Sequence, residues 1–412
     1  MTHCFSQPGL LPFEQAKSIL LESIQPVVGI ESVSIEKSLG RVLAEGISSP
    51  VNVPPHNNSA MDGFAFALSS HKKEHSLNLA GKAFAGDPFQ GKVKPGECIR
   101  IMTGAKLPED CDTVEMQENC QVDGDKILFL QEKKLGQNVR LAGEDIKQGD
   151  ALYQQGHKLC APDIGALASI GIAKVNVYRR INVALIATGD ELKSPDEQLS
   201  EGDIYESNRY FLKMMLHKLD VNVIDFGIIK DDLELITQAF VSADEQADIV
   251  ISSGGVSVGE ADYTKEVLES LGQVGFWKIA MKPGKPFAFG KLANSYFCGL
   301  PGNPVSALVT FYQLVVPSLY QLQGTESIEK VTLNAVTTTP LKKSPGRSDF
   351  QRGVWQVNDD GIIEVTSTGG QGSGILTSIA KANCFILLAK DQGPVDAGEQ
   401  VKIELFDELL LG

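Results

Sequence analysis

From about residue 181 onward, short apolar runs alternate with amphipathic segments along the chain. The apolar runs are rich in β-branched residues and predict buried strands; they cover residues 181–187, 221–229, 248–251, 276–280 and 296–299. Segments with helical periodicity separate them at 208–219, 233–243 and 263–271, and a long apolar helix is expected from 304 to about 321. Repeated strand–helix units predict an α/β domain with a mostly parallel sheet.

Two other regions contain short strands separated by Gly, Pro and Asp. Residues 47–146 predict a β-rich domain, and residues 327–412 a small C-terminal β-barrel. An amphipathic helix at 12–24 and a helix–strand segment at 159–177 flank the first β-rich region. We therefore expect four domains: a discontinuous helical domain (1–46 with 147–180), the β-rich insertion (47–146), the α/β domain (181–326) and the barrel (327–412).

Composition is that of a soluble globular protein, with 42% hydrophobic and 22% charged residues. A net charge of −15 and the absence of a long basic run argue against a nucleic-acid surface. The seven cysteines are dispersed without a CxxC pair, which indicates reduced thiols in the cytoplasm. The first residues have no export-signal pattern, and no apolar span approaches the ~20 residues that cross a bilayer. We expect a cytoplasmic protein that does not bind a membrane.

Acidic residues follow three of the predicted strands: Asp190 and Glu191, Asp231 and Asp232, and Glu260 and Asp262. The carboxyl ends of parallel strands meet at one edge of a sheet, where open α/β sheets bind ligands. Carboxylate oxygens are the ligands that Mg²⁺ prefers. The loop before the third pair contains Gly254 and Gly255, which let backbone N–H groups face an anion. An ordinary turn between strand and helix is the alternative.

Lysines concentrate where acids are missing. No Asp or Glu lies between Glu269 and Glu326, whereas Lys278, Lys282, Lys285 and Lys291 fall inside that interval. In so acidic a chain this gap favours a binding surface for phosphate or another oxyanion beside the carboxylate-bound cation. A lysine-lined sheet edge that prevents aggregation is the alternative.

Seven motifs occur in order along the chain. They are residues 58–65 (NSAMDGFA), 101–105 (IMTGA), 140–145 (RLAGED), 188–192 (TGDEL), 253–262 (SGGVSVGEAD), 282–286 (KPGKP) and 300–306 (LPGNPVS). Together they resemble the MoeA family of molybdopterin molybdenumtransferases, which is also present as a domain of gephyrin. The resemblance runs from about Pro8 to Phe406, and residues 347–353 and 372–378 also fit it.

The resemblance implies an architecture and a reaction. The architecture is an elongated four-domain homodimer with a MogA-like α/β domain, in which the discontinuous helical domain dimerises and the active site is shared between subunits. The reaction inserts molybdate into the dithiolene of adenylylated molybdopterin and releases AMP and the molybdenum cofactor. Both substrates are anions, so the expected cations and Mg²⁺ suit it. The pterin supplies its own sulfurs, so no cysteine motif is needed.

Site residues follow from matching the motifs position by position. The resemblance implies catalytic roles for Asp62, Thr103, Glu191, Asp231, Asp262, Lys278 and Lys282, with Glu191, Asp231 and Asp262 as the Mg²⁺ ligands. It implies substrate binding by Ser253, Gly254, Gly255, Ser257, Lys285, Pro301, Asn303, Pro304, Asp145 and Arg352. From the residues alone, a plain turn before a strand is the favoured interpretation of Asp62-Gly63.

Two other functions share parts of this pattern. A molybdopterin adenylyltransferase contains the same α/β domain but does not need the β-rich insertion or the C-terminal domain. A non-catalytic scaffold could use the fold for partner binding, which the full set of acids and lysines disfavours. Expected partners are the two substrates and a second copy of the chain, with an adenylyltransferase and cofactor-accepting proteins as further candidates.

Overall fold

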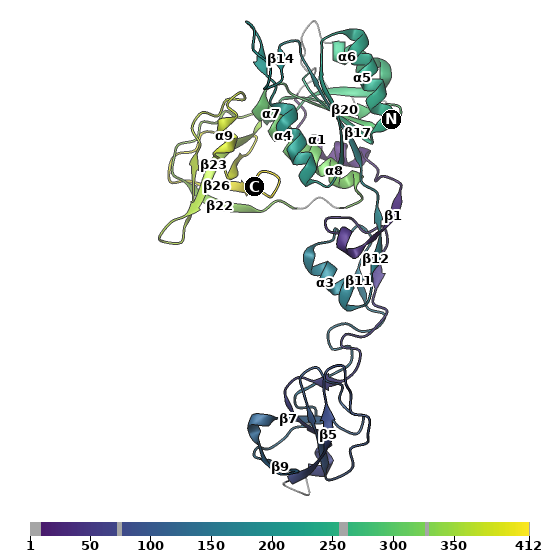
Figure 1. The fold of residues 1–412 in the computed structure, drawn as a ribbon. Coiled ribbons are helices and arrows are strands. Elements are labelled where there is room, and N and C mark those ends of the chain that lie inside the picture. Colours follow the sequence, from purple (N-terminus) through teal and green to yellow (C-terminus); the bar gives the residue numbers. More distant parts are fainter. Residues whose placement is uncertain (1–9, 72–75, 255–262, 326–328, 412) are drawn as a thin grey trace. The chain divides into compact units, whose positions relative to one another are not determined.

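The computed structural model describes residues 10–71, 76–254, 263–325 and 329–411 (Figure 1). The chain divides into two compact units. Unit 1 contains the chain up to Glu31 and from Tyr178 onward, and unit 2 contains Ser32–Val177. Each unit is described separately below.

Unit 1 is built on a six-stranded sheet with the order β16-β13-β17-β21-β20-β18. Its strands are β13 (Asn182–Thr188), β16 (Asn222–Ile229), β17 (Ile249–Ser253), β18 (Gln273–Lys278), β20 (Pro286–Lys291) and β21 (Tyr296–Leu300). The first four strands in the order run parallel, and β20 and β18 are antiparallel to their neighbours. The predicted mostly parallel α/β sheet is therefore confirmed.

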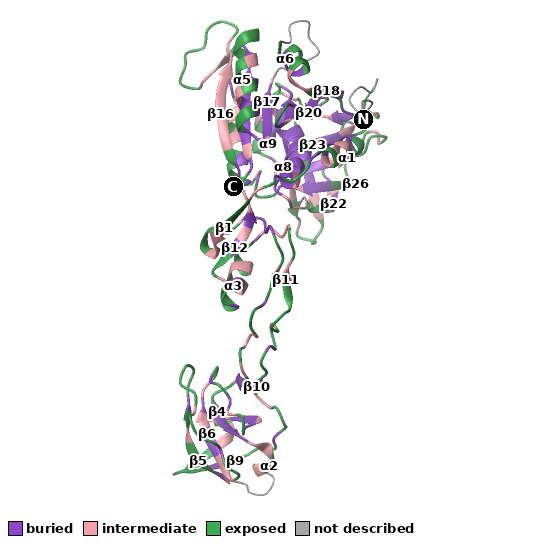
Figure 2. Ribbon diagram, turned by 90° about the vertical axis from the view of Figure 1, so that its right-hand side faces the viewer, coloured by how far each residue is buried: buried purple, intermediate pink, exposed green. Residues whose placement is uncertain are grey.

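Helices cover both faces of this sheet because alternate side chains of each strand point to opposite faces. The helical segments are α1 (Phe13–Ser23), α4 (Asn208–Lys218), α5 (Leu233–Gln246), α6 (Tyr263–Leu271), α7 (Pro304–Thr310), the π-helical turn η3 (Phe311–Val315) and α8 (Val316–Leu322). Val183 and Leu185 of β13 pack with α1, α4, α7 and α8. Ala184 and Ile186 of the same strand pack with α5 and α6. In Figure 2 strands β17 and β20 are mostly buried, the edge strand β16 is mostly of intermediate exposure, and much of α5 is exposed.

Helix α1 forms as the sequence predicts, with Phe13, Ala16 and Leu20 buried along one face. Its location differs from the expectation that it joins residues 159–177. Its buried face belongs to the core of unit 1, where it packs against α8, whereas residues 159–177 belong to unit 2. An amphipathic period shows that one face is covered but does not identify the covering element.

The helical run Pro304–Leu322 is long and apolar enough to cross a membrane by length and composition alone. In the structure 94% of the tested window is buried. Tyr312 and Leu319, for example, belong to the core below the sheet. The run is therefore a core helix of unit 1.

The C-terminal part of unit 1 is a closed barrel, as predicted. Its strands are β22 (Thr332–Thr337), β23 (Ser348–Val357), β24 (Ile363–Ser367), β25 (Cys384–Leu388) and β26 (Gln400–Leu405). Their order is β23-β24-β22-β26-β25, and an additional pairing of β23 with β25 closes the ring. The short strand β19 (Met281–Lys282) pairs in parallel with β23, and α9 (Thr377–Ala380) precedes β25.

Unit 2 is rich in strands, as the sequence predicts. A six-stranded sheet has the order β7-β4-β6-β5-β9-β8. Its strands are β4 (Gly63–Phe66), β5 (Ser76–Ala83), β6 (Glu97–Ile101), β7 (Thr113–Met116), β8 (Cys120–Asp123) and β9 (Lys126–Phe129). The remaining elements are β1 (Ile30–Ser34), η1 (Ile35–Lys37), β2 (Ile47–Ser48), β3 (Asn58–Ser59), α2 (Leu68–His71), η2 (Gln117–Asn119), β10 (Val139–Arg140), β11 (Ala151–Tyr153), α3 (Ala161–Ser169) and β12 (Lys174–Tyr178). Strand β1 begins in unit 1, and β12 ends there.

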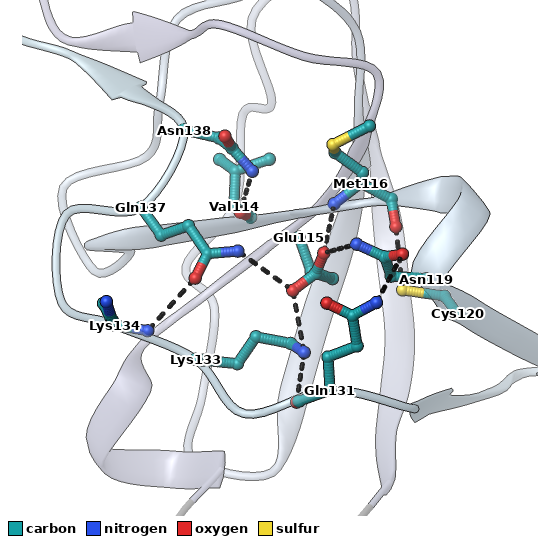
Figure 3. A network of polar contacts seen from close by, with 10 residues as sticks. All are labelled: Val114, Glu115, Met116, Asn119, Cys120, Gln131, Lys133, Lys134, Gln137 and Asn138. Carbon is teal, nitrogen blue, oxygen red and sulfur yellow. Dashed lines mark hydrogen bonds and ion pairs between the residues drawn. The ribbon is translucent and has the colours of Figure 1, made fainter.

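A fully buried charged pair lies inside unit 2. Lys133 Nζ is 2.7 Å from Glu115 Oε2, and both side chains have no exposed surface (Figure 3). Asn119 and Gln137 donate further hydrogen bonds to the two oxygens of Glu115, at 2.7 and 3.2 Å. The network satisfies the buried carboxylate from several sides, as a buried charge requires.

Candidate functional site

The carboxyl ends of β13, β17 and β21 meet in unit 1 at a glycine that no other residue can replace without strain. Gly254 has a φ of +92°, and a Cβ added there would lie 2.7 Å from the carbonyl oxygen of Thr188. The Gly254 N–H donates to the Leu300 carbonyl at 3.2 Å. The loop after β17 is thus in contact with the ends of both neighbouring strands, at the predicted edge of the sheet.

Three carboxylates approach one another beside this loop. The backbone N–H of Asp231 donates to Asp190 Oδ1 at 3.1 Å. Burial raises the pKa of the Asp231 carboxyl, and the nearby charges of Asp190 and Glu191 raise it further. Like charges held together in this way oppose ionisation unless a cation lies among them.

This crowding fits a divalent cation with oxygen ligands. Within the described residues, no group of three or more His, Cys, Asp or Glu side chains is arranged to hold a metal ion. Asp262, the third predicted ligand, lies outside those residues, as do Gly255 and Ser257. The Mg²⁺ site therefore stays a prediction. Of its three expected ligands, the structure describes Glu191 and Asp231.

Three of the four predicted lysines lie in or beside the turn between β18 and β20, whereas Lys291 stands at the far end of β20, opposite Gln273. Lys278 ends β18 opposite Pro286, and the Ile279 N–H donates to the Lys285 carbonyl at 2.7 Å. Lys278 and Lys285 are exposed, whereas Lys282 is partly buried and lies in β19. Lys282 Nζ is 3.3 Å from Asp349 Oδ2 in the barrel strand β23. The barrel therefore holds one lysine of the turn directly.

Arg352 carries a buried positive charge. Its side chain is fully buried, and burial lowers the pKa of the guanidinium to about 10. Its Nε donates to Ser378 Oγ at 3.0 Å, and Nη2 donates to the Gly372 carbonyl at 3.3 Å. Among the described residues, no carboxylate forms an ion pair with it. The charge of Asp349 raises the pKa of the guanidinium, but the direct hydrogen-bond partners are neutral, so an anion would stabilise the buried charge further.

Ser378 is absent from the predicted site residues, although its segment fits the family pattern. Its hydroxyl donates to the Ile375 carbonyl at 2.7 Å while accepting from Arg352. Only the fold shows this contact, because 26 residues separate the two side chains in the sequence.

The loop after β21 leads into the long core helix. Pro301 is buried, Asn303 is exposed at the N-cap of α7, and Pro304 stands in its first turn. Proline suits that position because its missing N–H would have no partner inside the helix. The Val305 N–H donates to the Ser373 carbonyl at 3.0 Å, which connects the helix start to the segment that Arg352 contacts.

The remaining predicted residues belong to unit 2. Asp62 Oδ1 accepts hydrogen bonds from the backbone N–H of Thr103 at 2.8 Å and from its hydroxyl at 2.7 Å. These two bonds lower the pKa of the Asp62 carboxyl. Asp145 is exposed, and its N–H donates to the Val53 carbonyl at 3.0 Å. The structure thus joins Asp62 to Thr103, which are 41 residues apart in the sequence.

The mostly parallel sheet, with acidic residues and a glycine loop at the carboxyl ends of its strands, corresponds to a known domain family. Residues 184–321 match the probable molybdopterin binding domain. Residues 11–171 match the MoeA N-terminal region, domains I and II, and residues 334–406 match the MoeA C-terminal region, domain IV. The chain belongs to the MoeA family.

Individual relatives agree over almost the whole length. A molybdopterin molybdenumtransferase of Haemophilus influenzae is 50% identical, with 97% of this chain and all of the relative covered. Gephyrin of Dictyostelium discoideum is 31% identical over 96% of this chain and 62% of the relative. The crystal structure of a molybdopterin biosynthesis MoeA protein from Pyrococcus horikoshii superimposes with a TM-score of 0.84 at 29% identity, covering 97% of this chain and all of that one.

Proposed function

We propose that this chain is a transferase of molybdenum cofactor biosynthesis. It inserts molybdate into the dithiolene of adenylylated molybdopterin and releases AMP. The relative from Haemophilus influenzae is named a molybdopterin molybdenumtransferase, which supports this proposal. The observation that carries the proposal is the crowding of Asp190, Glu191 and Asp231 beside the glycine loop. A cation would relieve that crowding, and it would then lie at the edge where open α/β sheets bind ligands.

Each group has a role that its surroundings favour. Glu191 and Asp231, with Asp262, would hold Mg²⁺, which offsets negative charge on the substrate phosphates and polarises them. Lys278, Lys282 and Lys285 bind the anionic groups of the pterin substrate and molybdate. Arg352 offers a further positive charge from the barrel. Gly254 lets the backbone approach the substrate, because no side chain intervenes.

The second half of the proposed site comes from another subunit. Asp62 and Thr103 of one copy act on the substrate that the α/β domain of the other copy binds, in a homodimer. The chain acts in the cytoplasm, where an adenylyltransferase supplies the substrate and cofactor-accepting proteins take the product. The tight bonds from Thr103 keep Asp62 ionised and oriented, which suits a carboxylate that positions water or metal-bound groups.

The test incubates the purified chain with adenylylated molybdopterin and molybdate and measures AMP release with and without Mg²⁺. We expect release that requires molybdate and Mg²⁺ and is abolished in Asp231→Ala. Equal release without molybdate would contradict the transferase proposal. Equal release by Asp231→Ala would remove the assignment of that carboxylate to the cation.

The adenylyltransferase alternative has its own assay. An adenylyltransferase would consume molybdopterin and ATP and accumulate the adenylylated product. That activity does not need the barrel, whose Asp349 forms an ion pair with Lys282. We therefore expect no adenylylation by this chain.

A further inference from the structure

Asn208 is a buried amide that lies between two of the proposed substrate-binding loops. It is the first residue of α4 and is 6% exposed. Its Nδ2 donates to Ser253 Oγ at 2.8 Å and to the Gly302 carbonyl at 2.8 Å. Ser253 stands at the end of β17, and Gly302 stands in the turn after β21. One side chain therefore connects both loops.

The two loops continue strands that are already paired. Ser253 is in register with Leu300, and the Gly254 N–H donates to the Leu300 carbonyl. Beyond Leu300 the chain turns away into α7, so backbone pairing ends there. Past the last backbone pair, the two hydrogen bonds of the Asn208 amide connect the loops and fix their separation.

The position of Asn208 is itself fixed by its neighbours. Glu206 is 4% exposed, and its Oε1 accepts from the Arg209 N–H at 2.7 Å, which anchors the start of α4. The Oδ1 of Asn208 is buried without a hydrogen-bond partner among the described residues. A buried acceptor without a partner is unfavourable, so the side chain is not placed there for stability alone.

We propose that Asn208 is a positioning residue that sets the spacing of these two loops for the pterin substrate. The inference rests on the proposed function, because it takes adenylylated molybdopterin as the ligand of the loops. Asn208 acts through Ser253 and Gly302 rather than on the reacting atoms. Its loss therefore weakens substrate binding more than it slows turnover at saturating substrate.

The test compares Asn208→Ala with Asn222→Ala. Asn222 is an exposed asparagine at the opposite end of the same sheet, in β16, where its amide bonds to Asn182. The primary measurement is the Kd of adenylylated molybdopterin, determined by calorimetry without molybdate so that no turnover occurs. We expect Kd and KM to rise about tenfold in Asn208→Ala, with kcat within about twofold, and no change in Asn222→Ala.

A purely structural role gives a different result. If Asn208 is only structural, Asn208→Ala lowers the Tm and the active fraction, and hence kcat, but leaves Kd unchanged. An unchanged Kd in Asn208→Ala therefore overturns the proposal, whatever the change in Tm. Asn208→Asp adds a second readout, because a carboxylate can still accept from the Ser253 hydroxyl but repels the Gly302 carbonyl. We expect it to weaken binding as well, and full retention of binding would also overturn the proposal.

The partner of the amide gives the closing experiment. Ser253 accepts one of the two bonds and is itself a proposed substrate-binding residue. We therefore expect Ser253→Ala combined with Asn208→Ala to raise Kd by less than the product of the two single effects. If the two substitutions raise Kd independently, so that their effects multiply, Asn208 does not act through Ser253. A wild-type chain that fails to bind the adenylylated pterin contradicts the proposed function, whereas equal binding by wild type and Asn208→Ala contradicts only this inference.

Discussion

At the scale of single residues, the buried pair of Lys133 and Glu115 shows how an ion pair becomes structural. Glu115 lies in the edge strand β7, where its partner across the sheet is the apolar Phe64 of β4. The ammonium of Lys133, the amides of Asn119 and Gln137 and the Met116 N–H all donate to its two oxygens (Figure 3). With so many donors the carboxylate is compensated, and removal of the cation leaves a buried charge without its counter-ion.

We expect Lys133→Met to lower the free energy of unfolding by about 3–5 kcal/mol, the range for breaking one side of a buried pair. Urea unfolding of the variant, followed by circular dichroism, measures the loss. Lys134→Met is the matched control, because Lys134 is the adjacent lysine and is exposed. The double variant Lys133→Met with Glu115→Leu should recover most of the loss, and a double variant as unstable as the single one would contradict this explanation.

Residue types and their spacing predicted which acids meet at the sheet edge but not the side-chain contacts of the candidate site. The acids after β13 and β16 were expected at one sheet edge, and the raised pKa of Asp231 agrees with that placement. The bond between Asp62 and Thr103 was not deducible from spacing, because pairing of β4 with β6 creates it. The burial of Arg352 was equally hidden, since arginine is usually exposed.

At the scale of elements, periodicity predicted most helices and strands but not their partners. Helix α6 begins and ends where predicted, at Tyr263 and Leu271. The long apolar helix was also expected, yet the π-helical turn η3 inside it was not, because no sequence signal distinguishes i→i+5 from i→i+4 bonding there. The packing of α1 depends on long-range contacts with α8, which a local pattern does not contain.

The loop after β17 gives a prediction at this scale. Gly254→Ala forces a Cβ to within 2.7 Å of the Thr188 carbonyl oxygen at a φ of +92°, so the loop must move away from β13. We expect a stability loss of about 1–3 kcal/mol from the strain and at least a tenfold loss of AMP release. Thermal unfolding and the AMP assay measure the two effects.

Gly393→Ala is the control for that change. Gly393 lies in the same unit with an ordinary φ, and nothing lies within 4 Å of an added Cβ. We expect it to match wild type in both assays. Normal AMP release by Gly254→Ala would mean that the backbone of this loop does not contact the substrate.

At the scale of the whole molecule, the sequence predicted the fold class of the domains better than it predicted which strands pair within them. The α/β sheet and the closed barrel were both expected, and both lie in unit 1. The strand order of the sheet and the reversal of β20 and β18 were not predicted, because hydrophobic periodicity carries no information on which strands pair. The contact between Lys282 and Asp349 follows from the docking of β19 on the barrel, which also had no local signal.

The proposed homodimer makes a prediction that joins the two units of the chain. Asp62 belongs to unit 2 and Asp231 to unit 1. If each active site takes Asp62 from one subunit and Asp231 from the other, a mixed dimer of Asp62→Ala with Asp231→Ala has one site with both substitutions and one with neither. Each variant alone should be inactive in AMP release, because every site then lacks one carboxylate.

Mixing the two inactive variants under conditions of verified subunit exchange should therefore restore AMP release, approaching half of the wild-type activity for each mixed dimer. Two copies of Asp62→Ala, unfolded and refolded together, serve as the control and should stay inactive. A site built within one chain predicts no recovery, because each site in the mixed dimer would keep one substitution. Inactivity of the exchanged mixture would thus reject the shared site, while AMP release by the wild-type chain would still support the proposed reaction.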